Sequence, residues 1–565
     1  MAPKILTQNV ISILYNVLMD RTENDPISGL KYPSVEIPKF NSRVSLILHS
    51  TAPLDTNSLS PEKLAALNAA ATIAGEAGRT CYSGTLQTPL DYLTRSSKYR
   101  EVTDNITRTT RESGHLSTRE HVHYTFAIEG ISRNAIYFLH SHPYYVSDMM
   151  SQRYVNLAET KPLIPDLGNS ELNQKAFEAA ANLVSGYNQL YRALTPTTKE
   201  LLLERFQGRN NPVWEKQIND EAGKKAQEVA RYLLPLGTPS SLYHTISEVT
   251  LLRLYHLSQT IPGQPEVQNI IEGMVAVVSQ TDPSFKQELT VPIEPFPNNP
   301  TPAFTDFSEE FDSLIDGFPI KLDPTQELPS QKLAQAVRNT LWKSSRELSD
   351  AEALDLLLNP AQNKLLSETS GDIVIDRLGQ CLNQVSFSAL VSLSHVANEQ
   401  FHRHRGFDHT EQTLLSIPQS DRDIIVPTIL EKNPEALNLY LTLQKQHNQT
   451  LTELHEAGVP LESLQYLLTN ATRIRKSINA PFGALYHFIK LRTCLTAQEE
   501  IYHLTLSLVK QIKDIDPVLG KYLESPSPCG IRRQANKTPY CSEGPRFCGI
   551  RVWDFKLDDF PKRYI

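Results

Sequence analysis

The stretch HVHYTFAIEGISR, residues 121–133, together with NAIYFLHSH, residues 134–142, decides how the first half of the chain folds. In its first part apolar side chains alternate with others, which is the pattern of a strand with one buried face. The alternating positions are Val122, Tyr124, Phe126 and Ile128. The residues after Arg133 regain helical spacing. The sequence therefore predicts a strand that leads directly into a helix.

The same succession occurs again in the second half. The apolar segment NQVSFSALVSLS, residues 383–394, predicts a strand, and HVANEQFHRHRG, residues 395–406, predicts a helix after it. Helical segments precede and follow both pairs. The period is too long for a solenoid, so the sequence indicates two similar units made by duplication. We expect a mixed α and β fold in which helices dominate.

The bulk composition is that of a globular protein. The 565 residues are too many for one ordinary core, and 40% are apolar and 21% charged. The net charge of −8 argues against a general nucleic-acid or membrane-surface binder, which usually needs a basic face. The opening residues lack the pattern of a signal peptide, and no stretch approaches a membrane span. The six cysteines, three of them spread singly, do not form the dense framework of a small secreted protein, so a reducing cytoplasm is expected.

A proline-rich and acidic stretch separates the two halves. It covers residues 281–330 and suits a linker or a surface wrap better than a core element. The expected division is an N-terminal extension at 1–50, a first domain at 51–282, a linker at 283–330, a second domain at 331–522 and a Cys-containing tail at 523–565. No role is predicted for the N-terminal extension.

Several motifs resemble those of a known family. GHLSTREHVHYTFAIEGISR at 114–133 and SQRYV at 151–155 stand in the first half, and QFHRHRGFDHTEQT at 400–413 stands in the second. NAPFGALYHFIKLR at 479–492 and TAQEEI at 496–501 follow them. Their order and spacing resemble the flavin-dependent thymidylate synthases. The resemblance implies an α+β fold of two tandem, helix-rich domains, each with a small antiparallel sheet, and a Cys-containing tail.

The first half keeps only part of the family pattern. Where the Arg-His-Arg signature should fall, the chain reads LHSHPYY at 139–145, so only His142 is present and Phe138 replaces the glutamine. The same half keeps the Ser-x-Arg segment at 151–153, which in the family holds the nucleotide. It also keeps Arg231 in VARYLLP, which resembles a second phosphate-binding arginine.

The second half shows the opposite selection. It has Gln400, the signature at 403–405 and Arg492, but Thr413, Leu415 and Gln465 stand where the nucleotide-binding residues should be. Random decay would have removed members of both sets from one copy. The complementary losses therefore predict one hybrid site made by both copies, either within one chain or between two chains. Two chains would form a homodimer that acts as a pseudo-tetramer, with two working and two dead sites.

The chemistry of arginine agrees with these roles. Its rigid fork can hold a phosphate or a uracil carbonyl with paired hydrogen bonds. By the resemblance, Arg492 would stabilise negative charge on the uracil ring, and Ser151 is the other catalytic candidate. The residues implied for dUMP are Gln400, Arg403, Met149, Met150, Ser151, Gln152, Arg153, Arg231 and Arg492. Those implied for FAD are His115, Ser117, Arg403, His404, Arg405, Glu411 and Asn479.

The implied reaction is the reductive methylation of dUMP to dTMP in nucleotide biosynthesis. Methylenetetrahydrofolate would supply the carbon, NADPH would reduce FAD, and no protein nucleophile would attack the pyrimidine. Pro481 and Met149 depart from the family pattern, at positions where arginine and Glu or Gln are usual. Flavin-dependent modification of another pyrimidine nucleotide is therefore an alternative, and a non-catalytic assembly partner is another. Nucleic-acid binding through the HRHR segment has little support from the acidic balance.

The tail brings three cysteines close together in sequence. Cys529, Cys541 and Cys548 fall within 20 residues, a spacing that resembles a small structural zinc loop. A structural zinc site normally has four ligands, so Cys494 or His487 would have to supply the fourth. Three free thiols are the alternative.

Overall fold

The computed structural model describes residues 32–49, 60, 70–260, 265–282, 285–286, 289, 304–323, 328–412, 414, 417–418, 423–544 and 547–565. These residues divide into two compact units. Unit 1 holds residues 1–151, 160–174 and 236–300, and unit 2 holds residues 152–159, 175–235 and 301–565. Part of the first copy, residues 175–235, thus belongs to the same unit as the whole second copy.

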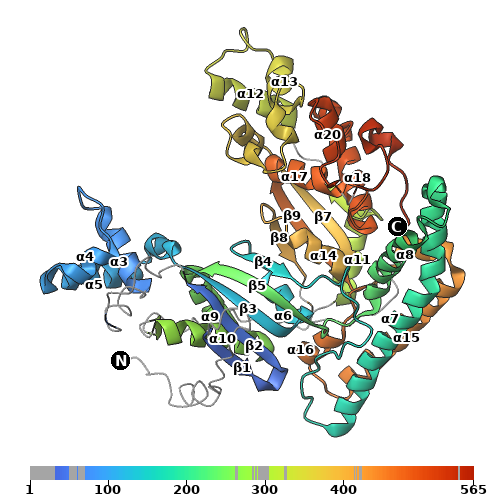
Figure 1. Cartoon of the computed structure of the whole chain (residues 1–565), viewed down its shortest axis with the longest axis horizontal. Coiled ribbons are helices and arrows are strands. Elements are labelled where there is room, and N and C mark those ends of the chain that lie inside the picture. The colour runs from blue at the N-terminus through green and yellow to red at the C-terminus, as the bar shows by residue number, and fades with distance from the viewer. Residues whose placement is uncertain are drawn as a thin grey trace. The chain divides into compact units, whose positions relative to one another are not determined.

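Unit 1 is built on a five-stranded antiparallel sheet of order β1-β2-β3-β5-β4. One face of the sheet packs against α6, α9 and α10, and apolar side chains from these elements form one buried core (Figure 1). The strands are β1 (Ser34–Ile37), β2 (Ser42–His49), β3 (His123–Ser132), β4 (Val146–Met149) and β5 (Pro239–Ser247). The helices are α3 (Ala70–Thr80), α4 (Pro89–Thr94), α5 (Ser97–Glu112), α6 (Arg133–Leu139), α9 (Glu248–Thr260) and α10 (Pro265–Thr281).

Unit 2 contains a four-stranded antiparallel sheet of order β6-β7-β9-β8. The strands are β6 (Ile320–Leu322), β7 (Ser386–Ser394), β8 (Asp408–Glu411) and β9 (Arg473–Pro481). The helices of the second copy are α11 (Phe304–Ile315), α12 (Pro329–Leu341), α13 (Asp350–Leu358), α14 (His395–His402), α15 (Pro434–Glu456), α16 (Leu461–Leu464), α17 (Phe482–Arg492), α18 (Glu499–Ile515), α19 (Pro517–Gly520) and α20 (Pro528–Gln534). From the first copy, unit 2 takes α7 (Ser170–Arg205) from Lys175 onward and α8 (Glu215–Ala230).

The two sheets share one plan. In each, a long strand leads into a short helix and pairs with a later strand, whose other side pairs with a four-residue strand. The corresponding strands are β3 and β7, β5 and β9, and β4 and β8. The strand-to-helix pairs that the sequence predicts are confirmed as β3 with α6 and β7 with α14, and so is the α+β, helix-rich fold with an antiparallel sheet in each copy.

A repeated polar contact at the strand-to-helix junction supports the duplication. Ser132 caps α6 by accepting from the Ala135 amide, and its own amide and hydroxyl donate to Glu266 at 2.7 and 2.5 Å. Ser394 caps α14 in the same way and donates to Glu500 at 2.6 Å through both groups. Each copy therefore ties its junction to the first turn of the second helix after the paired long strand, which is α10 after β5 and α18 after β9.

Glycine is required where β3 passes β2. Gly130 has φ +72°, and a Cβ there would lie 2.3 Å from the carbonyl oxygen of Asn41. The register of β3 against β5 shifts between Glu129 and Ile131, which is a bulge. Only a residue without a side chain allows this close approach.

Two long helices from different copies pack together in unit 2. Helix α7 lies along α15 (Figure 1), where the Lys175 ammonium is 2.6 Å from Glu453 and a Cβ on Gly186 would meet Leu443 at 2.6 Å. After α8, the carbonyl of Leu234 accepts from the Asn470 amide at 2.9 Å. The first copy is therefore joined to the second over much of residues 175–235.

Three regions of the structure differ from what the sequence predicts. The segment at 34–49, within the expected N-terminal extension, supplies β1 and β2 of a sheet. The proline-rich stretch contains α11 and β6 among its described residues. Helix α15 ends at Glu456, before Gly458 with φ +91°. After the short α16 the chain forms β9, although the sequence indicates helical segments after the second strand-to-helix pair. The domain boundaries remain a prediction.

Candidate active site

Arg153 and Arg231, the two expected phosphate arginines, both lie in unit 2. The Arg153 Nε is 2.8 Å from Glu228, and its Nη2 donates to the carbonyl of Thr496 at 3.1 Å. Arg231 stands at the end of α8, is 5% exposed, and donates from Nη2 to the side-chain oxygen of Gln498 at 2.9 Å. Both arginines of the first copy thus contact the segment before α18 of the second copy.

Gln498 also meets the second copy's own candidate residues. Its side-chain oxygen accepts from the amide of Gln400, which follows the Ser394 cap on α14. The backbone carbonyl of Gln400 accepts from Arg492 Nη2 at 3.1 Å. Buried Gln498 therefore links Arg231 of the first copy to Gln400 of the second. Gln400 in turn contacts Arg492 directly.

Positive charge gathers around Arg492. Burial, and then the charges of Arg403 and Arg153, lower the pKa of the Arg492 guanidinium to about 10. It stays cationic at neutral pH. Three guanidinium groups in one region favour an anion such as a nucleotide monophosphate.

His404, the centre of the Arg-His-Arg signature, is neutral at pH 7. Burial, with the charge of Arg492 second, lowers the pKa of its imidazole well below the usual value. Arg492 Nε donates to His404 Nε2 at 2.9 Å. The imidazole therefore accepts at Nε2, orients Arg492 and carries its proton on Nδ1. Arg403 and Arg405 on either side are exposed.

Glu411, expected to contact FAD, is held in a buried polar cluster. It accepts from His402 Nε2 at 2.7 Å, from Lys476 Nζ at 3.0 Å and from Asn398 Nδ2 at 3.0 Å. Lys476 faces Glu411 across the β8–β9 ladder. Asn479, two positions before the end of β9, accepts from Ser388 at 3.1 Å. The two residues are partners in the β7–β9 ladder.

The first copy has neither the carboxylate nor the ammonium of this cluster. In the β4–β5 ladder of unit 1, Met149 faces Leu242 at the positions that Glu411 and Lys476 occupy in unit 2. The carboxylate and the ammonium are both replaced by apolar side chains, so neither is left as an unpaired buried charge. Met149, which departs from the family pattern, is thus one of two replacements that occur together, and Leu242 is the other.

Other expected residues belong to unit 1. His115 and Ser117 are exposed in the segment before β3. The Met150 amide donates to the Ser241 carbonyl at 2.9 Å, and Ser151 is half-buried. Thr413 and Leu415 lie outside the described residues. A shared site for the residues of unit 1 and those of unit 2 remains a prediction.

The sequence model of the family described as thymidylate synthase complementing protein matches residues 63–284 and again residues 325–518. The chain belongs to this family. The two separate matches agree with the tandem arrangement inferred from the motifs and from the repeated sheet plan. The flavin-dependent thymidylate synthases, to which the motifs pointed, are therefore its relatives.

Curated relatives of the chain within the family are distant. A flavin-dependent thymidylate synthase from Thermococcus onnurineus is 28% identical over 138 residues, which is 23% of this chain and 56% of the relative. One from Clostridium tetani is 28% identical over 174 residues, 30% of this chain and 64% of the relative. The chain thus spans between half and two thirds of the length of these relatives.

A solved structure from the same family is less similar to the chain in sequence. Thymidylate synthase X from Helicobacter pylori, solved with FAD and dUMP, is 19% identical, and the match covers 44% of this chain and 99% of that chain with a TM-score of 0.27.

The zinc site expected in the C-terminal tail of this chain is not supported. Among the described residues, no group of three or more His, Cys, Asp and Glu side chains is arranged to hold a metal. Burial, followed by the nearby Cys541 and Cys494, raises the pKa of the Cys529 thiol, so Cys529 is a protonated thiol at neutral pH. None of the described helices is long and apolar enough to cross a membrane.

Some residues of the candidate site have no role implied by the family motifs. Gln498 stands within the quoted TAQEEI segment but received no function. Glu228 and Lys476 stand outside the quoted motifs. Charges on Lys225, Arg153 and Arg231 outweigh burial and lower the pKa of Glu228 to about 2. The available signal was a carboxylate three residues before Arg231, which lies beside it if the segment is helical.

Proposed function

We propose that this chain is a flavin-dependent thymidylate synthase that converts dUMP to dTMP with methylenetetrahydrofolate and NADPH. Membership of the family supports the reaction class. The observation that carries the proposal is the contact of Gln498 with both Arg231 and Gln400. It joins the nucleotide-binding residues of the first copy to the signature helix of the second within one unit of one chain.

The arginines divide the work of binding dUMP. Arg153 and Arg231 hold the phosphate, and Gln400 and Arg403 approach the nucleotide from the other copy. Arg492, oriented by His404, stabilises negative charge on the uracil ring when N3 ionises. Because burial removes competing water, this charge acts more strongly than it would on the surface.

Residues of the second copy fit a flavin with its diphosphate. Arg403 and Arg405 are exposed and flank His404, and His409 Nε2 is buried without a hydrogen-bond partner among the described residues. These donors and Asn479 would hold FAD. The flavin supplies hydride transfer when bound. The chain's own residues bind, orient and exclude water.

The hybrid site is tested by rescue of a thymidine-requiring strain. The whole chain should rescue growth, and Arg153→Ala and Arg403→Ala should each abolish rescue. Arg192→Ala, which changes an exposed arginine of α7, is the matched control and should rescue normally. Rescue by either of the first two variants would show that the hybrid site is wrong.

Mixing the purified variants distinguishes a site within one chain from one between chains. Since Arg153, Arg231, Gln400 and Arg492 all lie in unit 2, a mixture of Arg153→Ala and Arg403→Ala proteins should stay inactive. Recovery of activity would place the site between chains. Loss of the yellow flavin colour from the purified chain would instead favour a non-catalytic assembly partner.

A homodimer is the assembly that this proposal implies. Each chain would bring two copies, so two chains would complete the fourfold arrangement that the family forms from single subunits. Light scattering on the purified chain measures this directly. A monomer with full activity would contradict the pseudo-tetramer.

A further inference from the structure

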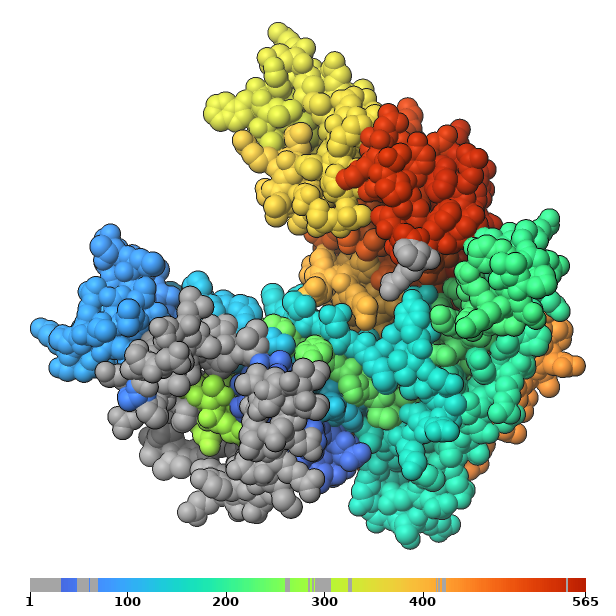
Figure 2. Space-filling view, in the orientation of Figure 1, coloured from blue at the N-terminus to red at the C-terminus, as the bar shows by residue number. Residues whose placement is uncertain are grey.

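Unit 2 contains a cavity beside the proposed dUMP site. Its volume is about 620 Å³, within the range of pockets that bind small molecules. It is lined by helices α7 and α8 and the turn after α7, by Arg153 and Tyr154, by the segment before α18 and by the C-terminal tail. In the space-filling view the tail, in red, lies beside the green residues of these helices (Figure 2).

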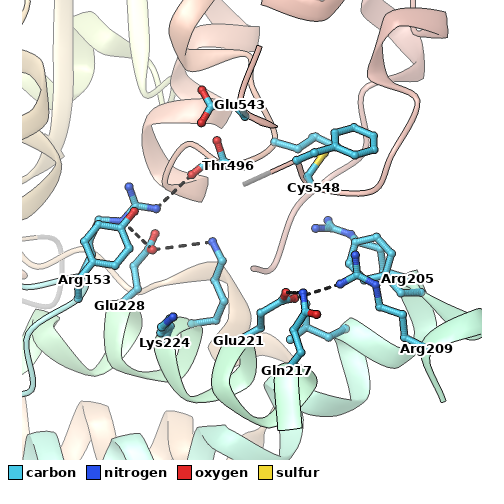
Figure 3. Close-up of a pocket in the computed structure, with 16 residues that line it drawn as sticks. Arg153, Arg205, Arg209, Gln217, Glu221, Lys224, Glu228, Thr496, Glu543 and Cys548 are labelled. Atoms are coloured by element: carbon cyan, nitrogen blue, oxygen red, sulfur yellow. Dashed lines mark hydrogen bonds and ion pairs between the residues drawn. The ribbon is translucent and has the colours of Figure 1, made fainter. Parts of the chain in front are cut away.

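The lining of the cavity is basic. Five cations line it against three carboxylates (Figure 3). The cations are Arg153, Arg205, Arg209, Lys224 and Lys225, and the carboxylates are Glu221, Glu228 and Glu543. Arg153 lies across the cavity from Arg205 and Arg209. The excess of two positive charges matches the charge of a phosphate monoester.

Two of the cations have no carboxylate partner. Arg153 and Lys225 are 2.8 and 3.8 Å from Glu228, and Arg209 is 3.4 Å from Glu221. Among the described residues, Arg205 and Lys224 form no ion pair. Burial lowers the pKa of Arg205, and no carboxylate counteracts it. Arg205 is partly buried and Lys224 is exposed at the rim of the cavity. A partly buried cation such as Arg205, without a counter-ion, favours binding of an anion.

Aromatic rings complete the lining. Tyr154 is 64% exposed and Phe547 is 36% exposed, although both line the cavity. Such rings can stack against a planar group of a ligand. Phe547 belongs to the tail, which lies beyond residues 325–518 and so outside the second family match. Gln400, Arg403 and Arg492 are absent from the lining, so the cavity shares only Arg153 and its partner Glu228 with the proposed dUMP site.

We propose that this cavity is a second ligand site, which binds a phosphorylated compound with a planar ring through Arg205 and Lys224. The C-terminal tail supplies one wall of the site. The proposal does not depend on the thymidylate synthase activity.

Binding of AMP to the whole chain, measured by calorimetry with dUMP present at saturation, tests the site. AMP carries both groups, whereas ribose 5-phosphate carries only the phosphate and should bind more weakly. Arg205→Gln and Lys224→Gln should each raise the dissociation constant of AMP about tenfold, because each removes a charge-assisted contact. Lys216→Gln on the exposed side of α8 is the matched control and should bind AMP as the original chain does.

Several results would overturn the proposal. They are no binding of AMP, displacement of AMP by dUMP, equal affinity for ribose 5-phosphate, or unchanged affinity in both cavity variants. Unchanged melting temperatures ensure that the two variants are folded. Arg492→Ala separates the two proposals, since it should weaken dUMP binding and leave AMP binding intact.

Discussion

At the scale of single residues, Gln498 lies within the TAQEEI motif, but the motif implies no role for it. Its carbonyl oxygen receives two donors, Arg231 and Gln400, and its amide donates to the hydroxyl of Tyr232 at 2.5 Å. It is fully buried, so a side chain that cannot accept would leave both donors without a partner. Gln498 is therefore a positioning residue for the two halves of the proposed nucleotide site.

Gln498→Leu should raise the KM for dUMP about tenfold, with a smaller effect on kcat, because the loosened groups bind the nucleotide. Steady-state kinetics at varied dUMP measures this split. Gln189→Leu on the exposed face of α7 is the matched control. A change in kcat alone would mean that Gln498 does not position the nucleotide.

A buried histidine gives a pH dependence at the same scale. Burial lowers the pKa of His447 from 6.5 to about 4, and its Nε2 donates to the Leu467 carbonyl at 2.7 Å. Between these values the unfolded chain binds a proton that the folded chain does not, so stability falls as pH drops from 6.5 towards 4. At pH 5 the loss is about 2 kcal/mol.

His447→Gln should remove that part of the acid sensitivity. The amide can still donate to the carbonyl but does not titrate. The difference between the melting temperatures at pH 7 and pH 5 should therefore be smaller in this variant than in the original chain. His121→Gln, at an exposed position, should keep the original difference, and an equal effect of both changes would contradict the assignment.

At the scale of elements, the β8–β9 pair carries a buried charge cluster that the β4–β5 pair has replaced by apolar groups. Glu411→Met alone leaves Lys476 without its carboxylate and should destabilise the protein by about 3 kcal/mol. Adding Lys476→Leu recreates the Met149 and Leu242 pair of unit 1 and should recover most of the loss. Thermal unfolding of the two variants measures this.

The same double variant should lose flavin while it remains folded. Flavin absorbance of the purified protein is the readout. If the double variant melted no higher than Glu411→Met, the two ladders would differ in more than this pair. If it kept its flavin, Glu411 would not contact FAD.

At the scale of the whole molecule, the two copies are not two units. Residues 175–235 pack with the second copy, where the Asn433 side chain donates to Ala193 at 3.2 Å and the Ala471 amide donates to Tyr232 at 3.0 Å. A fragment of residues 301–565 would expose the surfaces that cover α7 and α8. We expect it to be insoluble alone and to be rescued by co-expression with residues 1–300.

Co-purification of the two fragments through gel filtration tests this expectation. The joined pair should also retain the activity of the uncut chain, since both halves of the site would be present. A soluble and folded fragment 301–565 would contradict the role given to α7 and α8. Separate elution of two soluble fragments would contradict it as well.

Alternation and motif spacing were enough to predict β3, β7 and the helices after them, because one face of each strand is buried and repeats every second residue. The same reasoning missed β1, β2 and β6, since the first two lie in a segment with no quoted motif and the third is three residues long. It assigned Arg153 to the first copy and Arg403 to the second. Their positions in the sequence do not indicate how far apart the two side chains lie in space.

The sequence by itself determined the family, the duplication and the complementary losses, because motif order and residue type are properties of the chain. Only the tertiary structure decided that Arg231 and Gln400 meet at Gln498, residues that are 267 and 98 positions away from it. Such contacts depend on how α7 and α8 pack against α15 and α18, and packing is a property of whole surfaces. The order of the motifs therefore indicates the two copies, whereas the packing of buried surfaces between helices of both copies decides the two units.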